Sequence, residues 1–147
     1  MFFNFVYRLS YPGTDVFLVV FDIASPASFH NVKQRWFPEI QATKSFAENN
    51  KPIGARSFFR EQKKLGNWIL VATNSQLRND RDTIVELREK NQKPVSEQEG
   101  QTLAKDLGAY AYIEVDFGND ASVDAVFQNA VRVHRNAYNQ VPLQFRA

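Results

Sequence analysis

LSYPGTDVFLVVFDIASPASFHNVKQRWFPEI, residues 9–40, carries the strongest structural signals in this chain of 147 residues. Within it, Val16–Phe21 is apolar at every position, which is typical of a parallel strand covered on both faces. Ser25 and Pro26 are residue types that begin helices, and the apolar residues after them recur near helical spacing up to Ile40. Pro38 predicts a kink or an early end of that helix. The stretch therefore predicts a buried strand followed directly by a helix.

The rest of the chain continues this alternation of strands and helices. Trp68–Thr73 and the range 110–117 are β-rich apolar runs and predict a second and a third strand. The range 82–90 predicts a charged helix, and a capping box opens another helix over 96–108. The pattern predicts an α/β domain with a mostly parallel sheet flanked by helices. The final helix is predicted from apolar residues on one face: Val123, Val126, Phe127 and Ala130.

Length and composition favour one domain over residues 1–147. The net charge of +2 arises from Lys and Arg dispersed among Asp and Glu, so we expect no nucleic-acid partner. Because the chain contains no cysteine, it forms no disulfide or thiolate metal site and has no sulfur for a lipid anchor. Its longest apolar run is too short to cross a bilayer. Two segments lack periodicity: 41–67, predicted as an atypical polar insertion, and 138–147, predicted as a flexible tail.

The order of these stretches resembles one protein family. Residues 9–40 are similar to the end of switch II, the fourth strand and the third helix of Rho/Rac-type small GTPases, a branch of the Ras-like superfamily. WILVATNSQLRNDRDTIVELREKNQKPVSEQEGQTLAKDLGAYAYIEV, residues 68–115, resembles the fifth through sixth strands. Within it, LRNDRDTIVELREKNQKPV resembles the Rho-type insert helix. The resemblance implies an incomplete Ras-like, P-loop NTPase type, three-layer domain with that insert helix.

The phosphate-binding half of the family is not found in this sequence. No stretch matches G-x-x-x-x-G-K-[S/T], and residues 1–8 stand where the family has its phosphate loop, its magnesium-binding threonine and the D-x-x-G-Q segment. The resemblance therefore implies an N-terminally truncated member. We predict no catalytic residue and no metal site. GTP, GDP and Mg²⁺ are cofactors implied by the family alone.

The guanine-binding motifs are present but altered. The family's T-K-x-D motif aligns with Thr73, Asn74 and, at the aspartate position, Gln76. Glutamine offers one acceptor and adds an amide donor, so it matches the two donors of guanine poorly. Losing a charge-assisted pair there costs on the order of 1.5–3 kcal/mol. The S-A-L motif aligns with Asp116 and Phe117, where a carboxylate would repel the guanine oxygen and a large ring replaces a small residue. These five positions form a degenerate guanine site.

Three functions follow as hypotheses. The first is a Rho-like protein of small-GTPase signal transduction that neither binds nor hydrolyses GTP and acts as a binding module. The second is a GTP-hydrolysing Rho protein whose N-terminal segment is missing from this sequence, and the third is an unrelated α/β enzyme with a site at the strand ends. The resemblance implies Rho regulators and effectors as partners, namely exchange factors, GTPase-activating proteins and kinases acting on the cytoskeleton. It also implies a cytoplasmic location, with recruitment to the plasma membrane through those partners.

The missing first strand has a structural consequence. In Ras-like sheets that strand pairs with the fourth, so Val16–Phe21 is predicted to form an exposed apolar edge. We expect the protein to be either a monomer or prone to aggregation through this edge. A substitute strand at Phe2–Val6 would cover this edge.

Overall fold

The computed structural model describes residues 11, 14–42 and 66–140. Its centre is a three-stranded sheet in the order β1-β2-β3, with both pairs of neighbouring strands parallel. These strands are β1 (Phe17–Asp22), β2 (Trp68–Thr73) and β3 (Ala111–Glu114). The parallel α/β architecture predicted from the sequence is therefore confirmed, although β3 is shorter than the predicted range 110–117.

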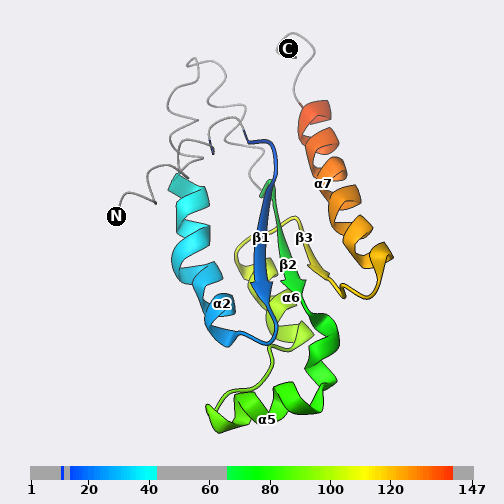
Figure 1. The fold of residues 1–147 in the computed structure, drawn as a ribbon. Coiled ribbons are helices and arrows are strands. Elements are labelled where there is room, and N and C mark those ends of the chain that lie inside the picture. Colours follow the sequence, from blue (N-terminus) through cyan, green and yellow to red (C-terminus); the bar gives the residue numbers. More distant parts are fainter. Residues whose placement is uncertain (1–10, 12–13, 43–65, 141–147) are drawn as a thin grey trace.

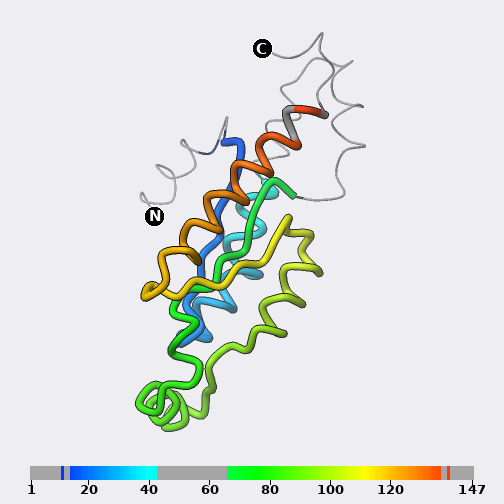
Figure 2. Tube along the Cα trace, turned by 90° about the vertical axis from the view of Figure 1, so that its right-hand side faces the viewer, coloured from blue at the N-terminus to red at the C-terminus, as the bar shows by residue number. Residues whose placement is uncertain are grey.

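Helices cover both faces of this sheet and form a three-layer arrangement (Figure 1). One face carries α2 (Pro26–Asn31), which continues as a π-helical turn, η1 (Val32–Trp36), and the same face carries α6 (Glu97–Asp106). The opposite face carries α7 (Asp120–Gln140), a long helix that runs beside the sheet (Figure 2).

Two further helical segments lie at the C-terminal ends of the strands. A 3₁₀ turn, η2 (Ser75–Asn79), follows β2 and leads into α5 (Arg81–Glu89). α5 lies beyond the end of the sheet, apart from the layers that cover its faces (Figure 1).

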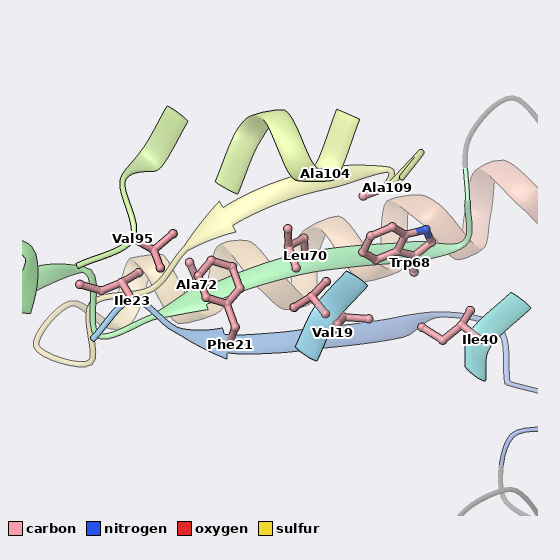
Figure 3. Close-up of a cluster of buried hydrophobic side chains, with 11 residues drawn as sticks. Val19, Phe21, Ile23, Ile40, Trp68, Leu70, Ala72, Val95, Ala104 and Ala109 are labelled. Carbon is pink, nitrogen blue, oxygen red and sulfur yellow. The ribbon is translucent and has the colours of Figure 1, made fainter. Parts of the chain in front are cut away.

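β2 is the most deeply buried element because both of its neighbours are strands and both of its faces are covered. Trp68, Leu70 and Ala72 point to the α2 and α6 layer, where they meet Val19 and Phe21 of β1 (Figure 3). Ile69 and Val71 point to α7. The rest of the first cluster comes from the helices and loops: Ile23, Val32, Ile40, Val95, Ala104 and Ala109.

Coverage of β1 differs from the prediction. Leu18 and Val20 are 39% and 51% exposed, because α7 packs over β2 and β3 rather than over β1. The expectation that both faces of this strand are covered is therefore wrong for the α7 face. Phe127, predicted to lie on the buried face of the last helix, is 60% exposed. Within the described residues, β1 is an outer strand of the sheet and pairs with β2 alone.

The helix after β1 does not stop at Pro38. Helical structure continues to residue 42, so an early end was wrong. The distortion lies one turn earlier, where the Phe37 N–H donates to the Val32 carbonyl in the wide π-helical turn. Proline has no N–H to donate to the preceding turn, and a π-helical turn of this kind is one of the recognised sources of helix kinks.

The predicted capping signals are confirmed in α6. Ser96 accepts from the backbone of Glu99, and the Glu99 carboxylate accepts from the backbone of Ser96, which completes the capping box. The helix ends before Gly108, whose φ of +70° lies in the left-handed region that glycine tolerates best.

Several predictions concern residues outside the described part of the chain. Most of the polar insertion 41–67 lies there, as does the substitute strand Phe2–Val6. α7 continues through Gln140 into the segment predicted as a tail, and residues 141–147 are outside the description. Among the described residues, no helix combines the length and apolarity needed to cross a bilayer.

Replacing Leu70 with alanine should destabilise the fold strongly. Leu70 is completely buried, and large-to-small core substitutions of this kind cost about 2–5 kcal/mol. Val85→Ala on α5 is the matched control, since Val85 is 47% exposed and should change the free energy of unfolding by less than about 0.5 kcal/mol. Urea unfolding of both full-length variants measures the difference. Equal midpoints would contradict the assignment of β2 as the core strand.

Candidate functional site at the strand ends

The C-terminal ends of all three strands meet at one edge of the sheet. There the Thr73 hydroxyl donates to the carbonyl of Phe21 (3.1 Å), which ties β2 to β1. The Ser75 N–H donates to the carbonyl of Val115 (3.1 Å), which ties the loop after β2 to the loop after β3. Ligand-binding loops of parallel sheets lie at this edge, so these loops form the candidate site.

The Asn74 side chain forms a hydrogen bond within the protein. Its φ of 60° is left-handed, a region that asparagine tolerates better than most residues. Its side-chain amide donates to the Asp22 carboxylate (2.9 Å), and the other oxygen of that carboxylate accepts from the N–H of Ala24 (2.8 Å). Asn74 therefore links the β1 and β2 loops, and its amide group is directed at Asp22.

Gln76 lies in η2 and is exposed. Within the described part of the chain its side-chain amide makes no hydrogen bond, so nothing there fixes its rotamer. A side-chain amide that offers both a donor and an acceptor can pair with either a donor or an acceptor of a ligand. It therefore selects neither strongly.

In the loop after β3, two backbone N–H groups donate to nearby side chains. The Asp116 N–H donates to the Ser122 hydroxyl (3.1 Å), and the Gly118 N–H donates to the Asp116 carboxylate (2.7 Å). The same hydroxyl donates to the carbonyl of Asp116 (2.9 Å) or of Asn119 (2.7 Å). Between these amides, the Phe117 side chain is 62% exposed. Of the three successive backbone amides at 116–118, those of Asp116 and Gly118 are thus already engaged in hydrogen bonds within the protein.

An ionic cluster that the sequence analysis did not identify stabilises this corner. Arg78 of η2 donates to both carboxylate oxygens of Glu114 at the end of β3 (2.8 and 2.6 Å) and to the Val95 carbonyl (3.2 Å). Tyr112 donates its hydroxyl to the same carboxylate (2.6 Å). The cluster connects the loop that carries Gln76 to the strand that leads to Asp116. No spacing in the sequence signals this pair, because its members are 36 residues apart.

Burial and hydrogen bonding shift the pKa values in this cluster. Burial acts to raise the pKa of Glu114, but hydrogen bonds from Arg78 and Tyr112 outweigh it, and the net pKa is lowered. The pKa of Tyr112 is raised, first by burial and then by its hydrogen bond to the carboxylate. The hydrogen bond to Glu114 raises the pKa of Arg78. The carboxylate is therefore ionised and Tyr112 protonated at neutral pH.

The structure places four of the five predicted site residues, Thr73, Asn74, Asp116 and Phe117, at this edge, with Gln76 in the turn that follows β2. It also shows that Asn74 and Asp116 make hydrogen bonds within the protein, which the sequence did not indicate. Within the described residues, no group of three His, Cys, Asp or Glu side chains is arranged to hold a metal ion.

Comparison with protein families identifies the class. The model of the Ras family matches residues 2–136, which is most of the chain. The chain therefore belongs to the Ras family of small GTPase-like proteins, and its three parallel strands flanked by helices agree with a Ras-like α/β domain. This membership replaces the hypothesis of an unrelated α/β enzyme. Ras-like GTPases bind GTP or GDP with Mg²⁺ and act through regulators and effectors.

The stability of the protein should fall as the pH drops below about 4.3, the pKa of an unfolded glutamate. A carboxyl with a lowered native pKa contributes stability above its unfolded pKa, and that contribution is lost as the pH falls through the native pKa. In Glu114→Gln this part of the pH dependence should disappear. Urea midpoints between pH 3 and pH 7 measure it, with Glu89→Gln on α5 as the exposed control. Parallel profiles for the wild type and Glu114→Gln would contradict the role of the cluster.

Proposed function

We propose that this Ras-family chain belongs to the Rho branch. The support is the stretch 77–95, which resembles the Rho-type insert, together with the helix α5 that lies between β2 and α6 at the position of that insert. Single-domain organisation over residues 1–147 is part of the same proposal. So is a cytoplasmic location in small-GTPase signalling that acts on the cytoskeleton.

We further propose that the corner at the strand ends does not select guanine nucleotides. Guanine presents two N–H donors and one carbonyl acceptor on the edge that its binding proteins contact, so a matching site needs a carboxylate and a free amide donor. Here the first position is the amide Gln76, and a carboxylate stands at the second position, Asp116. The observation that carries the proposal is that the N–H groups of Asp116 and Gly118 already donate within the loop.

The protein then acts as a binding module whose interactions do not depend on nucleotide. α5 is the surface that supports this most directly. It projects beyond the end of the sheet and, apart from Leu87, its side chains are exposed or half-buried. Glu86 and Lys90 pair on its surface (2.6 Å), an ion pair that a partner's charges can replace at small cost. Partners of the proposed class are Rho exchange factors, GTPase-activating proteins and effector kinases.

Addition of GTP or GDP should leave the melting temperature of the purified chain unchanged. A ligand present at a hundred times its Kd stabilises the native state by about 2.7 kcal/mol, which a thermal-shift assay detects readily. We expect the same absence of a shift with 1 mM GTP, GDP and ATP, about a hundredfold above a Kd of 10 μM, in the presence of Mg²⁺.

The substitutions Gln76→Asp and Asp116→Ser serve as controls for this experiment, since they restore the chemistry of the family motifs at two positions. A stabilisation of the wild type by GTP and GDP but not by ATP, lost on replacing Gln76 or Asp116 with alanine, would refute the proposal. It would favour instead a guanine-nucleotide-binding Rho protein. GTP turnover abolished by the same substitutions would refute it as well.

Binding to a regulator should be equally strong with and without nucleotide. We expect the Kd for a Rho exchange-factor catalytic domain or GTPase-activating domain to change less than twofold between buffer with GTP and Mg²⁺ and buffer with EDTA. Glu86→Lys on α5 should weaken the interaction, while Gln101→Lys on α6 is the matched control on another exposed helix. Binding that requires GTP would contradict the proposed module.

A further inference from the structure

The last helix, α7, has an inner face that the sheet covers and an outer face that faces solvent. Val126 and Val133 lie on the inner face and are buried against the sheet. The outer face carries a stripe of exposed residues that follow one another at intervals of three or four, which places them in one row along the helix. We call this row the outer stripe, and it consists of Asp120, Asp124, Phe127, Val131 and Arg135.

The outer stripe is apolar in the middle and carries opposite charges at its two ends. Phe127 and Val131 form the middle and are 60% and 56% exposed. Asp120 and Asp124 precede them, and Arg135 follows them. Across residues 11, 14–42 and 66–140, no ion pair involves Asp124 or Arg135. The helix therefore presents apolar side chains on two faces, although the sheet covers only one of them.

The order of residues in the outer stripe makes it complementary to a reversed copy of itself. In an antiparallel pair of α7 helices, a two-fold axis can pass midway between Phe127 and Val131, so that Phe127 of each copy lies beside Val131 of the other. Asp124 lies five residues before this midpoint and Arg135 lies six residues after it. The two side chains then differ by about 1.5 Å in position along the paired helices. Each copy thus supplies one half of an apolar contact and of an ion pair, and both interactions occur twice.

Other occupants of the outer stripe match it less well. A parallel pair of helices would place Asp124 beside Asp124 and Arg135 beside Arg135, and like charges brought together at an interface are repulsive. Helices that bind a lipid surface carry Lys and Arg on their polar face, whereas the outer stripe contains two carboxylates. An antiparallel second copy accommodates the apolar middle together with the charges on either side of it.

We propose that the outer stripe of α7 is a docking surface for a second copy of this chain, bound as an antiparallel pair of helices. Contacts between Phe127 and Val131 form the centre of the interface. The pairs between Asp124 and Arg135 select the antiparallel direction over the parallel one. This surface goes beyond the proposed function, since a binding module that pairs with itself presents its partner-binding helix twice.

Charge reversal in the full chain tests this interface. Sedimentation velocity between about 5 and 200 μM should show a dimer whose share rises with concentration. Asp124→Arg and Arg135→Asp should each weaken the dimer at least about tenfold, because each replaces two attractive pairs with two repulsive ones. The double variant Asp124→Arg/Arg135→Asp exchanges the charges and should restore the Kd to within about threefold of the wild type. Glu89→Arg, a charge reversal at an exposed position of α5, is the control and should leave the Kd unchanged.

Disulfide formation tests the direction of the helices independently, because the chain contains no cysteine of its own. In the antiparallel pair the two copies of residue 128 lie close to the two-fold axis, about 3 Å apart along the helices, which allows a disulfide. The two copies of residue 121 lie about 24 Å apart along the helices. Gln128→Cys should therefore oxidise to a covalent dimer, whereas Ala121→Cys, the control, should remain monomeric.

Three results would overturn the proposal. The wild-type chain could remain monomeric at the highest of these concentrations. A dimer could form that Asp124→Arg leaves unchanged, or that the double variant fails to restore, and either result would assign the contact to another surface. Ala121→Cys could form covalent dimers as readily as Gln128→Cys, which would indicate a parallel pair.

Discussion

The burial of β2 between two parallel neighbours and two helical layers is the constraint on which the rest of the structure depends. Trp68, Ile69, Leu70 and Ala72 expose 1% of their surface or less, and their side chains alternate between the α2 and α6 layer and α7. Since burying one such side chain contributes about 1.5–3 kcal/mol, the strand fixes the position of both layers. Because its neighbours are parallel to it, it also brings the three loops at the strand ends to one edge.

Which ligands those loops could bind depends on the hydrogen bonds that their polar groups already make within the protein. Asn74 donates to Asp22, and the amides around Phe117 donate to Ser122 and Asp116. Each bond stabilises a loop and occupies a donor within the protein. The bidentate pair of Arg78 and Glu114 then holds the β2 loop against β3. These internal bonds support the proposal that the protein does not act as a nucleotide switch.

Much of this fold could be predicted because its signals are local. The apolar runs of β1 and β2, the capping box at Ser96 and the glycine at 108 each act within a few residues, and all are confirmed. Exposure of Leu18, Val20 and Phe127 could not be predicted from periodicity, because it depends on which strands α7 covers. The π-helical turn before Pro38 likewise carries no signal in the apolar periodicity.

The candidate site was predictable in position but not in its interactions. Aligned motifs located Thr73, Asn74, Gln76, Asp116 and Phe117, since strand ends follow from strand positions. The bonds that occupy Asn74 and Asp116 depend on loop conformation, and the partners Arg78 and Glu114 are joined only by the sheet. Sequence reasoning therefore found the altered residues and missed the contacts that explain how the corner is closed.

The central claim, that this corner does not hold a guanine nucleotide, is tested most directly by the contents of the protein itself. The full chain should be purified in Mg²⁺-containing buffer without chelator and denatured, and the released nucleotides quantified by chromatography. The account predicts far less than one equivalent of guanine nucleotide per chain. Recovery of close to one equivalent of GDP or GTP would contradict it.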